Sequence, residues 1–204
     1  MTTPVPAALR DRPLAIVDVE GNGAQPPEIV EIAVLPVDGP VTPAAMRTWL
    51  VRPKNPVTSI ARRLHGLDTE QLRHCPWWQD IAEQVQPLLD GRTMIAHAAG
   101  VDYRVLAAHL PTWQPPLVLD TLKLARHVWP ELPGHRLTEL AAHTGITGEQ
   151  TDDHRPHRAG YDTWCTWQLL QHLLHHSDPS WDKLVDIAAL RAFRPPTRPQ
   201  AGLW

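Results

Sequence analysis

The chain has 204 residues, 43% hydrophobic and 20% charged, which is typical of one globular domain with its own core. No apolar run is long enough to span a membrane, and the first residues lack the basic start and apolar stretch of a signal peptide. The net charge of −3 argues against a module that binds nucleic acid by long-range attraction alone. Cys75 and Cys165 lack metal-site spacing, so we expect a reduced, cytoplasmic protein.

Apolar runs bounded by turn residues predict the strands. The first run ends at Asp18 and Glu20 and is nearly continuous, as in a central strand buried on both faces. A turn signal at residues 21–23 follows, and two further runs separated by short links predict an antiparallel meander. The predicted strands cover residues 14–19, 29–37, 46–51, 93–96 and 117–119.

Helical spacing of apolar residues predicts helices that alternate with the later strands. They cover residues 62–67, 76–89, 102–110, 121–128, 137–143 and 158–174, and Asp178-Pro179 begins a last helix through about residue 192. A meander followed by strand–helix alternation predicts an α/β domain with a mixed five-stranded sheet flanked by helices. We expect a loose lead-in at residues 1–12, one domain at 13–193 and a flexible Pro-rich tail at 194–204.

Four carboxylates stand where this fold would bring them together. Asp18 and Glu20 are two residues apart on a strand, so both point to one face of the sheet. Asp102 and Asp162 fall in the first turns of two predicted helices. Converging carboxylates repel one another unless cations lie between them, and hard oxygen ligands suit Mg²⁺ or Mn²⁺ better than Zn²⁺. The sequence therefore predicts a divalent-cation site.

These acids and His157 stand in the order and spacing of the DEDDh 3′–5′ exonucleases, and the chain resembles that family, which includes polymerase proofreading subunits and ribonuclease T. The resemblance covers about residues 13–176; the matching stretches include residues 28–35, 64–67, 119–122 and 136–140. It implies a ribonuclease-H-like fold. It also implies hydrolysis of single-stranded 3′ ends of DNA or RNA to nucleoside monophosphates, with two divalent cations, Mg²⁺ or Mn²⁺, and no membrane partner.

The resemblance also implies a role for each catalytic residue. Asp18 would bind both cations, and Glu20 and Asp162 would complete one of the two cation sites. Asp102 would act mostly through water. His157 would be the general base that takes a proton from the attacking water, a task that suits histidine because it titrates near neutral pH.

His157 and Asp162 cannot both face the site from one regular helix. Five residues turn a helix by roughly 500°, which is about 140° off the same face. We therefore expect His157 at the start of the helix or on the preceding loop, where Pro156 and the polar residues 152–155 stand. His154 is the rival base, and a plain surface histidine in a polar loop is the alternative to a catalytic role.

The resemblance implies substrate contacts as well, at Gly21, Asn22, Gly23, His65 and Val101. The family usually has Thr-Thr-Gly at residues 21–23, so contact with the terminal nucleotide would here be mainly through the backbone. The family's usual Asn is replaced by Ala98, and its usual Phe, which packs on the last base or sugar, is replaced by Val101. These departures affect substrate affinity and preference, whereas the cation-binding positions and the histidine are intact.

Two other functions fit the same residues. A catalytically weak nucleic-acid-binding or scaffold protein could keep the fold, and an oligoribonuclease-like hydrolase could act on very short RNA. The intact acids and histidine favour an enzyme, and the low net charge argues against a binding module. The choice between DNA and RNA and the oligomeric state stay open at this point.

Overall fold

The computed structural model describes residues 4–148, 151 and 155–194. In this part of the chain a five-stranded sheet has the order β3-β2-β1-β4-β5. β1 pairs antiparallel with β2 and parallel with β4, so the predicted meander and the mixed sheet are confirmed. The strands are β1 (Leu14–Gly21), β2 (Ile29–Val37), β3 (Arg47–Leu50), β4 (Thr93–Ala96) and β5 (Val118–Asp120).

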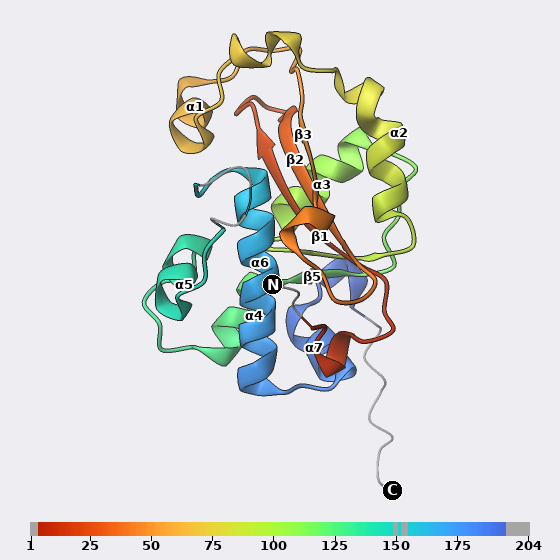
Figure 1. Cartoon of the computed structure of the whole chain (residues 1–204), viewed down its shortest axis with the longest axis vertical. Helices are drawn as coiled ribbons and strands as arrows, with labels where there is room; N and C mark the ends of the chain where they lie inside the picture. The colour runs from red at the N-terminus through yellow and green to blue at the C-terminus, as the bar shows by residue number, and fades with distance from the viewer. Residues whose placement is uncertain (1–3, 149–150, 152–154, 195–204) are drawn as a thin grey trace, which may run out of the picture.

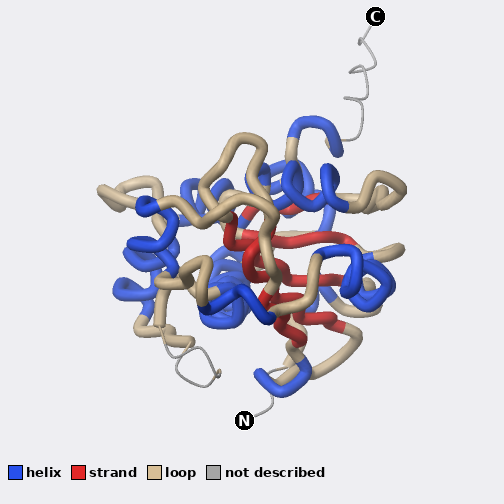
Figure 2. Tube along the Cα trace, turned by 90° about the horizontal axis from the view of Figure 1, so that it is seen from above, coloured by secondary structure: helices blue, strands red, loops and turns tan. Residues whose placement is uncertain are grey.

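Helices cover both faces of the sheet, which forms the middle layer in Figures 1 and 2. The longest helix, α6, lies along β1 and β2 and shares one core with α4, α5 and α7, while α2 and α3 cover the opposite face. The helices are α1 (Ser59–His65), α2 (Trp78–Leu89), α3 (Gly100–His109), α4 (Thr121–Val128), α5 (Leu137–Thr144), α6 (Ala159–Ser177) and α7 (Trp181–Ala188). No helix in the described ranges is long and apolar enough to cross a membrane.

The central strand β1 explains where the acids lie. Leu14 and Ile16 pack into the core on the α6 side, and Val17 packs into the core on the α2 side. Because successive side chains of a strand point to opposite faces, Asp18 and Glu20 continue the row of Leu14 and Ile16 toward α6. The apolar run thus fixes the strand, and its last residues carry carboxylates to the face that α6 covers.

The last helix is shorter than predicted. The sequence favoured a helix over residues 178–192, but α7 covers Trp181–Ala188. Asp178 has a left-handed φ of 35° at the end of α6, so the new helix cannot begin there. At the other end, the Leu190 N–H donates to the Val118 carbonyl, because the chain leaves the helix to pair with the edge strand β5.

The segment before β1 is part of the packed domain. The lead-in was expected to be loose, but within residues 4–12 a 3₁₀ turn at Ala7–Leu9 buries Leu9 in the core on the α6 side. The other 3₁₀ turns of the described ranges are Pro43–Ala45, Gln71–His74 and Arg191–Phe193. The predicted tail from residue 195 onward and the rival base His154 lie outside the described residues.

Candidate active site

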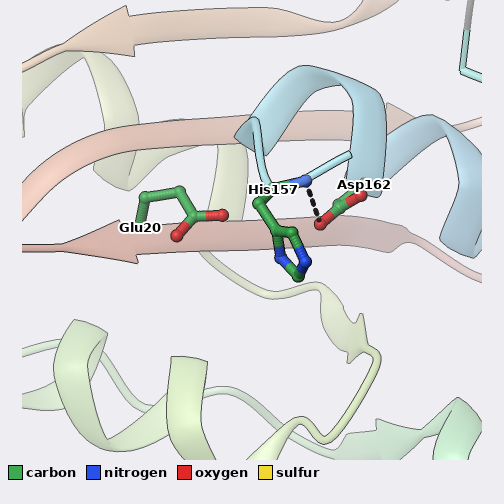
Figure 3. Close-up of side chains that lie close together, drawn as sticks. All are labelled: Glu20, His157 and Asp162. Carbon is green, nitrogen blue, oxygen red and sulfur yellow. Dashed lines mark hydrogen bonds between the residues drawn. The ribbon is translucent and has the colours of Figure 1, made fainter. Parts of the chain in front are cut away.

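Three of the predicted catalytic residues lie together at the end of β1. Glu20 extends from the strand, Asp162 lies in the first turn of α6, and His157 precedes that helix. Each offers one possible ligand atom, and these atoms lie within 4.8 Å of one another. Figure 3 shows the imidazole of His157 between the two carboxylates. Asp18, on the same face of β1, lines the same cavity as Asp162 and His157.

Burial and mutual repulsion raise the pKa of every carboxyl in this group. Burial, reinforced by the charges of Asp162 and Glu31, raises the pKa of Glu20 to about 8. Burial raises the pKa of Asp102 to about 7 and that of Asp162 to about 7. Burial and then the neighbouring carboxylates raise the pKa of Asp18 well above its ordinary value. The folded protein therefore holds these groups where their charged forms are disfavoured unless a cation is present.

The buried carboxylates of the site fit divalent cations. Asp18 Oδ2 and Asp162 Oδ1 are buried and have no hydrogen-bond partner among the described residues. A buried acceptor without a partner is costly, and a hard cation is the natural partner of a carboxylate oxygen. Asp102 is not one of the three residues whose possible ligand atoms lie within 4.8 Å of one another. It is bonded to β1, because its Oδ1 accepts the Val19 N–H at 3.1 Å.

His157 lies before the helix, as the rotation argument predicts. Helix α6 begins at Ala159, and His157 has a left-handed φ of 59°. Its backbone N–H donates to Asp162 Oδ2 at 3.2 Å. A left-handed conformation costs a non-glycine residue about 1–3 kcal/mol, and such strain is common at functional sites. The turn thereby brings the imidazole to the same side as the carboxylate five residues later.

His65 does not have the place that was expected for it. Its side chain is only 1% exposed, so it cannot contact the terminal nucleotide directly in this structure. Nε2–H donates to the Gly21 carbonyl at 3.2 Å, and Nδ1 accepts the Leu67 N–H at 3.1 Å. Burial lowers the pKa of His65, in keeping with this neutral tautomer. The residue fixes the end of β1 next to Glu20.

The turn after β1 is also occupied by internal contacts. Asn22 is fully buried, its Oδ1 accepts two backbone N–H groups, and its own N–H and carbonyl bond to Glu28 and Thr58. Gly23 has a φ of 79° and packs so closely on Thr58 that a Cβ would lie 2.2 Å from the hydroxyl oxygen. The backbone of Asn22 is therefore unavailable to a substrate, contrary to the expectation. Val101 is 54% exposed at the start of α3.

A cavity of about 750 Å³ opens over the carboxylates. Asp18, His157 and Asp162 line it together with residues of α4 and of the segment that leads into α5. The sequence pattern named His65 but missed its neighbour Leu64, which is half-exposed and lines this cavity. The remaining lining residues are His97, Ala98, Leu122, Arg126, Pro133, Gly134, His135, Arg136, Leu137, Thr138 and Glu139.

Ala98 has a backbone conformation that asparagine adopts more readily than alanine. Its φ is 60°, in the left-handed region, and its N–H donates to Asp120 Oδ1 at 3.0 Å. Asn adopts this region far more readily than Ala, which gives a physical reason for the Asn usual in the resembling family. Asp120 Oδ1 also caps α4 through the Leu122 N–H, so one carboxylate holds both segments.

The sequence pattern missed Glu31, which anchors the start of α6. Glu31 faces Glu20 across the β1–β2 ladder and is 2% exposed. Its two oxygens receive the Arg158 guanidinium at 2.6–3.1 Å, and Oε2 also accepts the Ala159 N–H at 3.0 Å. A single charged residue inside the apolar run of residues 29–37 is the signal that could have revealed it.

A model of the exonuclease family RNase T matches residues 15–170. The chain belongs to this family. The exonuclease is 31% identical over 177 residues to exodeoxyribonuclease 10 of Escherichia coli strain K12, and the match covers 85% of this chain and 74% of that protein.

A longer protein and two solved structures are also similar to this exonuclease. The 3′–5′ exonuclease DinG of Bacillus subtilis is 28% identical over 167 residues, which span 78% of this chain but only 17% of DinG. The structure of exonuclease X in complex with 5′-overhanging duplex DNA is 28% identical with a TM-score of 0.69, covering 85% of this chain and 98% of that one. Exonuclease I of E. coli with a dT13 oligonucleotide, at 16% identity and a TM-score of 0.64, shares the fold.

In this exonuclease we expect Glu31→Gln to lower the free energy of unfolding by about 3–5 kcal/mol, because the change removes the buried carboxylate that pairs with Arg158. Denaturant unfolding followed by tryptophan fluorescence measures the change. Asp38→Asn is the matched control, because Asp38 pairs with Arg92 at the surface with 62% of its side chain exposed. That change should cost about 1 kcal/mol or less. Equal losses in both variants would contradict the anchoring role of Glu31.

Proposed function

We propose that the chain is a metal-dependent 3′–5′ exonuclease that releases nucleoside monophosphates from single-stranded 3′ ends of DNA or RNA. One observation carries this proposal: His157, Asp18 and Asp162 line one open cavity, and Glu20 lies beside His157 and Asp162. Two buried carboxylate oxygens, of Asp18 and Asp162, have no hydrogen-bond partner among the described residues. The names of the relatives support it, since one is a 3′–5′ exonuclease and another an exodeoxyribonuclease. The intact site favours hydrolysis over a binding or scaffold role.

Asp18, Glu20, Asp102 and Asp162 would hold two divalent cations, Mg²⁺ or Mn²⁺. When bound, the cations would supply the positive charge that stabilises the attacking and leaving oxygens of the phosphodiester. The protein holds three of its ligands rigidly: Glu20 by the central strand, Asp162 by the anchored start of α6, and Asp102 by the Val19 N–H. Such fixed placement avoids reorganisation during the reaction.

His157 would be the general base. Its imidazole lines the cavity beside Glu20 and Asp162, so a water near the scissile phosphate could pass its proton to a ring nitrogen. The adjacent carboxylates would stabilise the resulting imidazolium. Because His157 lies in a left-handed turn before α6, its ring can face the same cavity as Asp162, which a regular helix through both residues would not allow.

We expect His157→Ala to lower turnover about 10²–10⁴-fold, the usual contribution of a positioned general base, while cation binding persists through the carboxylates. Release of nucleoside monophosphate gives the rate, and the rise in melting temperature with Mn²⁺ gives the binding. His127→Ala is the control, because His127 is exposed on α4 and does not line the cavity. Turnover of His157→Ala within tenfold of the wild type would refute the assignment of the base.

The preferred substrate should be a single-stranded 3′ end. Carboxylates and cations must surround one phosphodiester, so the terminal nucleotides must be unpaired, which costs a few kcal/mol per base. With a net charge of −3, the chain has little general attraction for phosphate to offset that cost. We therefore expect faster release from a single-stranded 3′ end than from the same strand in a blunt duplex, by about tenfold or more.

Initial rates on 5′-labelled DNA and RNA test this preference. The substrates are a single strand, a blunt duplex, a duplex with a 5′ overhang, a circular strand and a strand blocked by a 3′-phosphate. Exonuclease X was solved with 5′-overhanging duplex DNA, so that substrate is the strongest rival. Asp18→Asn, purified in parallel, excludes a contaminating nuclease. Equal rates on single-stranded and blunt ends would overturn the preference, and cleavage of the circle would overturn 3′-end exonuclease action.

A further inference from the structure

One wall of the cavity, formed by α4 and the segment that leads into α5, carries two arginines. Arg126 lies in the last turn of α4, and Arg136 immediately precedes α5. Both line the cavity that Asp18 and Asp162 line, and both are exposed. The cavity therefore carries basic as well as acidic side chains, which suits a ligand whose negative charges need both cations and protein donors.

These two guanidinium groups are available, unlike other arginines beside the site. Arg158 is held by Glu31, and Arg155 donates to the His65 carbonyl. Among the described residues, neither Arg126 nor Arg136 has an ion-pair partner within 4.0 Å. Glu139 also lines the cavity, but its Oε2 accepts the Arg136 backbone N–H at 2.9 Å and so caps α5.

Hydrogen bonds fix this basic wall relative to the carboxylates. The ring of His97, just after β4, donates from Nε2 to the His135 carbonyl at 2.9 Å and bonds through Nδ1 to Thr121 Oγ1 at 2.9 Å. The ring of His135 in turn donates from Nε2 to the Trp129 carbonyl at 2.9 Å. His97 thus bonds the residue before Arg136 to the end of β4 and the start of α4, and the His135 ring bonds the segment to itself. A binding group placed in advance loses less entropy when ligand arrives.

We propose that Arg126 and Arg136 bind the phosphate one linkage to the 5′ side of the scissile bond. The inference rests on the proposed function. When the released nucleotide is the 3′-terminal one, it ends in a hydroxyl, so no phosphate lies beyond the scissile bond on that side. The next phosphate of the strand lies on the 5′ side. Two guanidinium groups offer planar pairs of donors that match phosphate oxygens. This subsite would allow a chain of net negative charge to bind a short stretch of single strand.

The test compares an ordinary oligonucleotide with one that carries a neutral methylphosphonate at the second linkage from the 3′ end. For the wild type, we expect this substitution to lower kcat/KM about 10–100-fold, mainly through KM, the size expected for losing charge-assisted hydrogen bonds. The double variant Arg126→Ala/Arg136→Ala should show a similar loss on the ordinary oligonucleotide and little further loss from the methylphosphonate. Arg73→Ala is the control, because Arg73 is exposed and lies outside the cavity lining.

A single-phosphodiester substrate separates this subsite from the chemistry. The p-nitrophenyl ester of thymidine 5′-monophosphate has no second phosphate, so its hydrolysis by the wild type reports the carboxylates and His157 alone. If the wild type cleaves neither this ester nor the oligonucleotides, the proposed function fails and the subsite with it. If the wild type cleaves them and the double variant keeps the full methylphosphonate penalty or the full rate on the ordinary oligonucleotide, the assignment of Arg126 and Arg136 is overturned while the proposed function stands.

Discussion

Burial of several carboxylates at the end of β1, reinforced by their mutual repulsion, is the constraint on which the rest of the site depends. The apolar residues of β1 pack into cores on both faces, so Asp18 and Glu20 cannot move away from Asp162. Two remedies exist for such a cluster: protonation, which the raised pKa values express, and the binding of cations. A third remedy, pairing with arginine, serves Glu31; among the described residues, Asp18, Glu20, Asp102 and Asp162 form no ion pair with lysine or arginine within 4.0 Å.

The residues around the cluster hold it in place. His65 bonds the end of β1 to α1, Asp102 bonds α3 to β1, and Glu31 bonds β2 to the start of α6. Each of these polar side chains is buried, and each connects an element of the site to the sheet. Together these hydrogen bonds hold the elements of the site beside a cavity that both acidic and basic side chains line.

Much of this could be predicted from the sequence, because local patterns decide it. The continuous apolar run marked β1 as central, and the two-residue spacing of Asp18 and Glu20 placed both on one face. Tertiary contacts decided what the patterns missed. The residues around His65 and Asn22 in the sequence do not indicate whether these side chains are exposed or buried. Helix α7 ends early because Leu190 pairs with β5, a contact between segments far apart in the sequence.

The unfolding temperature measured against pH, with EDTA or with excess Mg²⁺, tests the central constraint most directly. A carboxyl whose pKa is raised by folding contributes stability that is fully present below about pH 4 and is lost as the pH rises through about 7–8. In EDTA the melting temperature should therefore fall from pH 5.5 to 8.5. Mg²⁺ at about 100 times its Kd should raise it by about 5–10 °C at pH 8.5 and by less at pH 5.5. A melting temperature unaffected by Mg²⁺ across this range would contradict the account.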